Sequence, residues 1–151
     1  MNRVNNAANL VRDLFRKLTA NYDGQQFLSA ISKAAWVRWR QSIAIYDGRA
    51  RLALRDLGFN APDNDYPAYY HAWMQFFNNN DTQMGLNDAC QWLPNSHYAQ
   101  SVVERGGAAR DDIDQWVKTD WFRNRIIDMR LFHHHDQLHA ADKARFLGPG
   151  E

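Results

Sequence analysis

The sequence predicts an all-α protein with a single domain of about six to eight helices. Every long apolar pattern repeats with the helical period, and no alternating run reaches the length of a strand. A chain of 151 residues fits one domain and is long enough to bury a core. The single cysteine, Cys90, excludes an intramolecular disulfide framework and a zinc cluster built on cysteines.

Two helices are expected in the first forty residues. Apolar residues recur at helical spacing between about residues 3 and 20, and the turn Asn21–Gly24 closes this amphipathic pattern. The helical register resumes at Phe27 and continues to about Trp39. Lys33 therefore lies on or beside the second helix.

The next two helices have recognisable ends. Residues 43–46 are apolar but too few to predict a strand, and Asp47 then opens a helix that ends before Gly58. The turn-rich residues 59–65 form a loop. Pro67 is well placed to begin a helix whose aromatic residues either fill the core or line a stacking pocket.

Further helical segments follow in the second half of the chain. A helix is expected after Asn78–Asp81, and Pro94 stops it. The next helix covers His97–Glu104 and ends at Gly106–Gly107. A last helical region begins at Asp111 or Asp112 and is interrupted near Thr119. Residues of its expected buried face include Ile127 and Met129. We expect one helical domain over residues 1–142 and a frayed tail over residues 143–151.

The charge balance limits the classes of partner. A net charge of +1 excludes a general basic field, so nucleic-acid binding would depend on a local patch. Fourteen of the 18 basic residues are Arg, whose planar fork suits phosphates and aromatic faces, although genomic bias explains the excess equally well. No apolar run approaches membrane-spanning length and the N-terminus lacks a signal-peptide core, so we expect a cytoplasmic protein without a membrane partner.

The candidates for chemistry lie in the segment SKAAWVRWRQSIAIYDGRA, residues 32–50. Judged by spacing alone, Asp47 is a helix N-cap, because its carboxylate can accept the free amides of the first turn. Lys33 alone is an ordinary surface lysine.

This segment resembles the helix-hairpin-helix DNA glycosylase superfamily, specifically its compact relatives with the 8-oxoguanine-glycosylase fold. Such proteins carry Ser-Lys on one helix, followed by an apolar run into Ile-Tyr-Asp-Ser-Arg-Val, and Ser32-Lys33 and Ile45–Ala50 match this pattern. The match covers about residues 30–57, and Phe122–Leu131 is similar, less specifically, to the closing helix of these proteins. The chain departs from the pattern in lacking a glycine-rich hairpin before the lysine and in having Gly48 after the Asp.

The resemblance implies an orthogonal, glycosylase-like bundle that binds DNA, with Lys33 as nucleophile and Asp47 as its electrostatic partner. A carboxylate stabilises the positive charge that develops on the sugar, and a desolvated amine can attack the anomeric carbon and form a Schiff base. Capping by Asp47 is compatible with this role. An inactive relative or an all-α interaction module stays open as the alternative, and a metallo-hydrolase that uses histidines is a remote one.

Basic and aromatic residues surround this pair. The candidates for contact with DNA are Arg38, Arg40, Arg49, Arg51, Trp39 and Tyr46, with Trp36 and Arg55 nearby. Such a lining suits phosphates and an extruded base. Alternatively, the tryptophans belong to the core and the arginines solvate helix faces.

The tract LFHHHDQLH places His135 and His139 on one helix face, at the i, i+4 spacing that lets two imidazoles share a metal. Asp136 is adjacent, but a catalytic site needs a third ligand, which His71 or His97 could supply only if the fold happened to bring one of them to the pair. The tract also lacks the Glu of an HExxH motif. The helix dipole or solvent explains such histidines more simply. Because the chain also lacks a phosphate-binding glycine loop, a nucleophile elbow and a dinucleotide fingerprint, we expect no metal and no cofactor.

Overall fold

A computed structural model describes the backbone of residues 3–21 and 27–147, and the side chains of residues 9–18, 20 and 27–140. Within these ranges the chain forms eight α-helices and one short 3-10 helix, without a strand, which confirms the all-α prediction. The elements are α1 (Arg3–Asn21), α2 (Leu28–Arg38), α3 (Gly48–Asp56), α4 (Tyr66–Phe77), α5 (Asn80–Trp92), η1 (Leu93–Asn95), α6 (His97–Glu104), α7 (Arg110–Trp116) and α8 (Asp120–Leu147). The turn predicted at Asn21–Gly24 falls mainly outside the described residues.

Local capping explains why these helices begin and end where the sequence predicts. Asp65 accepts a hydrogen bond from the backbone N–H of Ala68 at 3.0 Å, and Ser96 accepts one from that of Ala99 at 3.2 Å. Gly58 has a φ of +87°, a left-handed conformation that suits a residue without Cβ after a helix. These interactions involve only near neighbours in the chain, so a sequence pattern can predict them.

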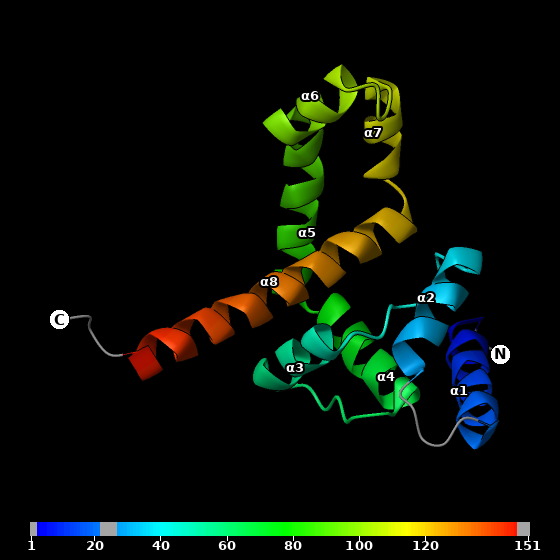
Figure 1. Cartoon of the computed structure of the whole chain (residues 1–151). Helices are drawn as coiled ribbons and strands as arrows, with labels where there is room; N and C mark the ends of the chain where they lie inside the picture. Colours follow the sequence, from blue (N-terminus) through cyan, green and yellow to red (C-terminus); the bar gives the residue numbers. More distant parts are fainter. Residues whose placement is uncertain (1–2, 22–26, 148–151) are drawn as a thin grey trace.

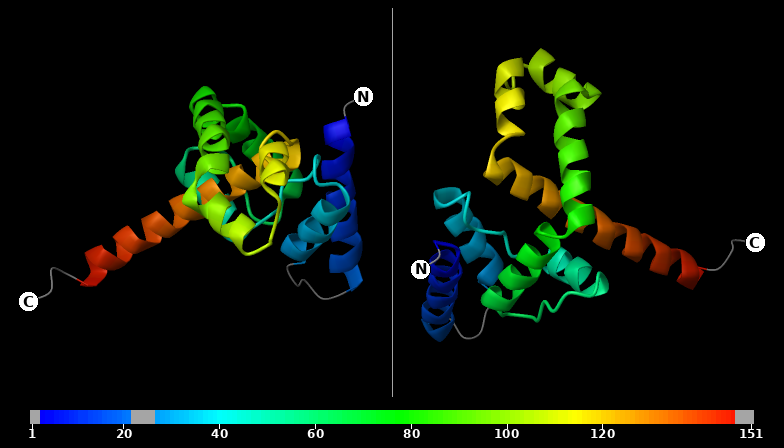
Figure 2. Two further views of the ribbon diagram at one scale, coloured as in Figure 1. Left: turned by 90° about the horizontal axis from the view of Figure 1, so that it is seen from above. Right: turned by 180° about the vertical axis from the view of Figure 1, so that it is seen from behind.

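The helices form a compact lower body and an arch above it (Figures 1 and 2). Helices α1 and α2 lie side by side, and α1 also packs against α4. The arch consists of α5, η1, α6 and α7, and it returns the chain to the beginning of α8. Helix α8 then crosses the body, packs against α3 and projects beyond it with its last turns.

The aromatic residues of α4 fill the core. Tyr66, Tyr69 and Trp73 are at most 2% exposed, so they do not line a stacking pocket. The Tyr66 hydroxyl donates to the carbonyl of Ala44 and the Tyr69 hydroxyl to that of Ile45, each at 2.7 Å. Helix α4 thereby fixes the segment that joins α2 to α3, which contains the candidate site.

Helix α8 differs from the sequence prediction in two details. Met129 was expected on the buried face but is 52% exposed, because Ile127 and Leu131 form the inner face and Met129 lies between them on the outer side. The helix also continues to Leu147, past residue 142 where the sequence places the domain end. Among the described helices, α8 included, none combines the length and the apolar character that crossing a bilayer requires.

Candidate functional site

A buried hydrogen bond joins the two segments that carry Lys33 and Asp47. The hydroxyl of Ser32, which is fully buried, accepts from the backbone N–H of Tyr46 at 2.9 Å and donates to the carbonyl of Ser29 at 3.0 Å. Lys33 and Asp47 each follow one member of the Ser32–Tyr46 pair in the chain. The structure therefore brings the two predicted residues to neighbouring backbone positions, although 14 residues separate Ser32 from Tyr46.

Asp47 is the N-cap that its spacing predicts. Its Oδ1 accepts from the backbone N–H of Arg49 at 2.9 Å, and its backbone is extended before α3 begins. Asp47 is half-buried, whereas Lys33 is exposed on α2. The two side chains form no ion pair with each other, so the amine is available to a substrate and the carboxylate keeps a fixed orientation from its cap.

A second carboxylate, Asp128 of α8, lies beneath this site. It is 2% exposed, accepts a hydrogen bond from Trp73 Nε1 at 3.1 Å and faces Arg125 at 3.6 Å. Burial, together with a smaller effect of the Asp47 charge, raises the pKa of Asp128 to about 7 against the opposing effects of Trp73 and Arg125. Asp47 and Asp128 are therefore close enough to interact electrostatically, and Asp128 can hold a proton near neutral pH.

Sequence analysis missed Asp128, but the sequence contains an indication of it. Asp128 comes directly after Ile127 and three residues before Leu131, both of which lie on the apolar stripe of α8. An acidic residue on a buried stripe needs partners, and such residues are enriched at functional sites. The pattern alone does not identify those partners, because Trp73 is 55 residues away in the chain.

A groove of about 420 Å³ lies where α2 ends, and it contains three of the predicted DNA-binding residues. It is lined by Val37, Arg38, Trp39, Arg40, Gln41, Ser42 and Trp121. The Arg40 guanidinium lies 5.7 Å from the ring centre of Trp36 and 5.9 Å from that of Trp121. Two guanidinium groups and the exposed indole of Trp39 thus share one surface.

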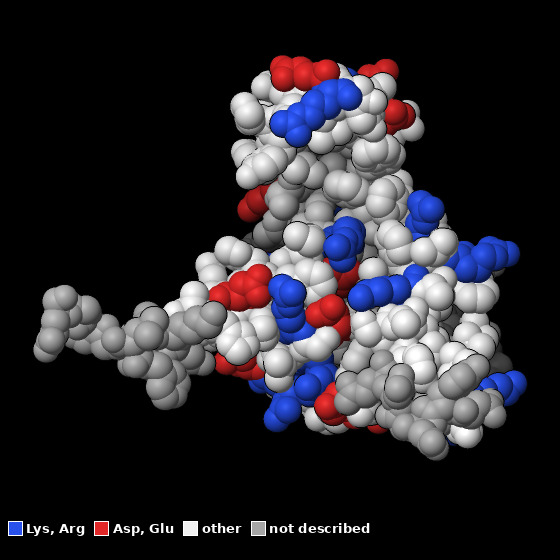
Figure 3. Space-filling model, viewed as in Figure 1, with Lys and Arg blue, Asp and Glu red and all other residues white. Residues whose placement is uncertain are grey.

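Lys33 is one helical turn from this groove. Val37 lines the groove and follows Lys33 by four residues, so both side chains lie on the same face of α2. In Figure 3, basic side chains gather over the end of α2 and the beginning of α8, whereas acidic and basic side chains alternate further along α8. A local basic patch therefore lies beside Lys33.

The other three predicted DNA contacts are engaged within the protein. Tyr46 is buried and donates its hydroxyl hydrogen bond to Asp63 at 2.9 Å. The side chain of Arg51 is 12% exposed and faces Asp63 at 3.6 Å. Arg49 is exposed but lies 3.5 Å from Asp136. Tyr46 and Arg51 thus hold the loop before α4 in place, whereas Arg38 and Arg40 in the groove at the end of α2 form no ion pair with a described residue.

The histidine tract lies on α8 where this helix packs against α3, and His134 Nε2 is 2.7 Å from Asp56 Oδ2 of α3. The rings of His135 and His139 are 4.4 Å apart between centres, and His135 Nδ1 is 3.4 Å from Asp136 Oδ1. His135 is buried and His139 is exposed. Within the described residues, no group of three His, Cys, Asp or Glu side chains is arranged to hold a metal ion, and neither His71 nor His97 joins the pair.

Comparisons of the chain with family models, with curated proteins and with solved structures find no match. The functional interpretation consequently depends on the geometry of the Lys33–Asp47 site and of the groove beside it.

Proposed function

We propose that this chain is a DNA-binding protein that cleaves the bond between a base and its sugar, with Lys33 as nucleophile and Asp47 as electrostatic partner. The observation that carries the proposal is the buried hydrogen bond between Ser32 and Tyr46. It fixes α2 relative to the first turn of α3, so the amine and the carboxylate extend from adjacent positions. Preorganised placement of this kind is what a charge-stabilising group needs.

The chemistry requires a neutral amine at Lys33. The amine nitrogen attacks C1′ of the sugar while the bond from C1′ to the base breaks, and the electron pair of that bond leaves with the base, which takes up a proton. Loss of a proton from the attached nitrogen and opening of the sugar ring then give the imine. Lys33 is exposed in the free protein, so its amine is accessible to bound DNA.

The groove at the end of α2 supports contact with DNA. Arg38 and Arg40 offer charge to phosphates, and Trp39 is 42% exposed, so that an unpaired base can stack on its indole. The proposed nucleophile lies one helical turn away, which puts the reacting sugar beside the phosphate contacts. Electrostatic attraction at this patch compensates for the low net charge of the chain.

Replacing Asp47 separates its catalytic role from its capping role. Asn caps helices about as well as Asp, so Asp47→Asn should leave the melting temperature nearly unchanged. It should slow base release by roughly 10²-fold, because the negative charge beside the sugar is lost. The assay is base release from duplexes that carry oxidised, alkylated or deaminated bases. Equal rates for the wild type and Asp47→Asn would leave Asp47 as a cap only.

A non-catalytic interaction module is the second candidate, and one feature of α1 favours it. Leu10, Leu14 and Leu18 recur every four residues and are 36–38% exposed, so they form an apolar stripe on the outer side of the helix. Leu14→Lys places a charge in the middle of this stripe, so it would abolish binding of a partner that covers the stripe. If Leu14→Lys still releases bases, the enzymatic function is favoured. If the wild type releases no base but binds a partner that Leu14→Lys does not bind, the interaction module is favoured.

A further inference from the structure

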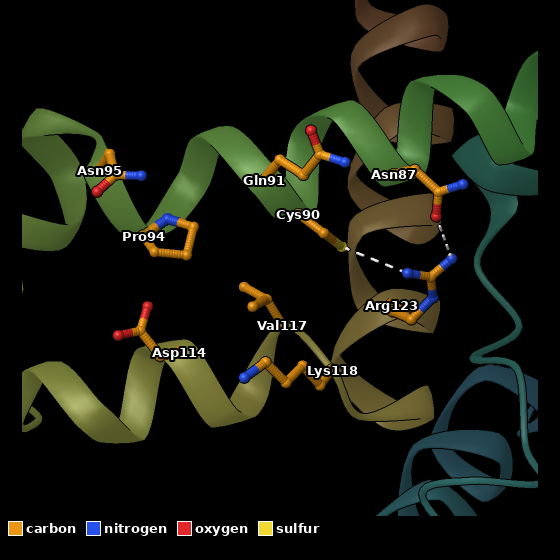
Figure 4. A pocket seen from close by; sticks show the side chains of 9 residues that line it. All are labelled: Asn87, Cys90, Gln91, Pro94, Asn95, Asp114, Val117, Lys118 and Arg123. Carbon is orange, nitrogen blue, oxygen red and sulfur yellow. Dashed lines mark hydrogen bonds between the residues drawn. The ribbon is translucent and has the colours of Figure 1, made fainter.

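A cavity of about 550 Å³ lies between α5 and α7, inside the arch and apart from the Lys33–Asp47 site (Figure 4). Cys90, Pro94 and Val117 form a buried, apolar floor. Polar and charged side chains surround this floor on both helices. An apolar base with a few convergent polar groups is typical of small-molecule sites, and the volume falls in their usual range of roughly 300–1,000 Å³.

One end of the cavity carries positive charge without a matching acid. Arg123 donates to the amide oxygen of Asn87 at 2.9 Å and lies 3.9 Å from the sulfur of Cys90. Its third partner is the amide oxygen of Gln83 at 3.5 Å. Burial raises the pKa of the Cys90 thiol, against the lowering effect of Arg123, so all three partners of this guanidinium are neutral at physiological pH. Lys118 is exposed on the side of α7 and extends towards Asp114 rather than towards Arg123 (Figure 4), and neither cation forms an ion pair with any described residue.

The other end of the cavity offers hydrogen-bond acceptors. Asp114 extends from α7 into the gap, opposite Asn95 of η1 (Figure 4). Arg110 donates to the side-chain oxygen of Asn95 at 2.8 Å and thereby ties α7 to η1 at this end. With Arg123 bound to Asn87, arginine hydrogen bonds connect the two sides at both ends and hold the cavity open. A carboxylate and amides suit the hydroxyl groups of a ligand.

We propose that this cavity binds a small, hydroxylated phosphate ester of the size of a sugar phosphate. The phosphate binds Arg123, and the exposed side chain of Lys118 turns from Asp114 towards it, so that two positive charges match a phosphate dianion. The hydroxyl groups extend towards Asp114 and Asn95, and the sugar ring covers the apolar floor at Cys90 and Val117. This site is independent of the proposed action on DNA.

Isothermal titration calorimetry on the full chain tests the proposal, with glucose 6-phosphate, glucose and inorganic phosphate as probes. Glucose 6-phosphate should bind with one molecule per chain. Glucose should bind much more weakly because it lacks the phosphate, and inorganic phosphate more weakly because it makes no contact with Asp114 and Asn95. Lys118→Gln should weaken binding of glucose 6-phosphate about tenfold through one lost charge-assisted hydrogen bond. Lys33→Gln, the matched control, should leave it unchanged.

Several results would overturn this site. They are the absence of binding by glucose 6-phosphate at millimolar concentration, equal affinity for glucose or for inorganic phosphate, and equal loss in Lys118→Gln and Lys33→Gln. The side chain of Lys118 is exposed, so its replacement is compatible with folding, which circular dichroism verifies. Absence of glucose 6-phosphate binding would not count against the proposed base release, because Lys33 and Asp47 lie outside the cavity.

Discussion

Replacement of Asp128 by Asn should stabilise the protein above neutral pH and have little effect in acid. Burial raises the pKa of Asp128 from 3.8 to about 7, whereas the unfolded chain keeps the ordinary value. Below about pH 4 both states bind the proton, so the group does not affect the free energy of unfolding. Between about pH 4 and pH 7 only the folded state keeps it, so the wild type loses stability as the pH rises.

The size of this loss follows from the difference between the two pKa values. A difference of roughly three pH units, at about 1.4 kcal/mol each, corresponds to about 4 kcal/mol by the time the folded state is fully ionised. Asn carries no charge, and its amide oxygen can still accept the hydrogen bond from Trp73 Nε1. The variant gives up the contact of the charge with Arg125, so its net gain above neutral pH is smaller than the full amount.

Urea unfolding followed by tryptophan fluorescence measures this effect at about pH 4.5 and about pH 8. Asp88→Asn is the matched control, because Asp88 is exposed on α5 and forms no ion pair with a described residue. The free energy of unfolding of Asp128→Asn, relative to the wild type, should rise from the lower to the higher pH, while that of the control should not. A variant that is less stable than the wild type by the same amount at both values would refute the reasoning.

Two further variants test the frame and the groove of the candidate site. Ser32→Ala leaves the buried N–H of Tyr46 without its acceptor, so it should lower the free energy of unfolding by about 1–3 kcal/mol and also slow base release. Ser29→Ala is the control in both assays. An unchanged rate of base release in Ser32→Ala would show that this hydrogen bond does not position Lys33 and Asp47. The double variant Arg38→Ala, Arg40→Ala should weaken DNA binding and lower the slope of log affinity against log salt concentration by the equivalent of about two phosphate contacts, whereas Arg105→Ala should change neither. An unchanged slope would show that the groove does not contact DNA.

The sequence predicted those features that depend on near neighbours in the chain. The cap at Asp47, the beginning of α4 beside Pro67, the role of Gly58 and the bounds of α6 all follow from local hydrogen bonds or local backbone conformation. Helical periodicity also predicted that Lys33 lies on α2. These features need no knowledge of how the helices pack.

The remaining features arise from packing between distant segments. Arg51 and Tyr46 were predicted to contact DNA, but both bind Asp63, which the pattern around α3 does not reveal. The bond between Ser32 and Tyr46 and the burial of Asp128 likewise depend on how α2, α3, α4 and α8 pack. A periodic pattern shows which face of a helix is apolar, but it does not show which polar groups meet there.

Borohydride trapping is the most direct test of the claim that Lys33 is a nucleophile. Borohydride reduces an imine between an amine and the sugar to a stable secondary amine, which keeps the protein attached to the DNA. The wild type should give a trapped complex on at least one duplex with an abasic, oxidised, alkylated or deaminated site, and peptide mass spectrometry should locate the link at Lys33. Lys33→Gln should give no complex while it binds the same DNA with nearly wild-type affinity. A complex that persists in Lys33→Gln, or a wild type that traps none of these duplexes, would contradict the account.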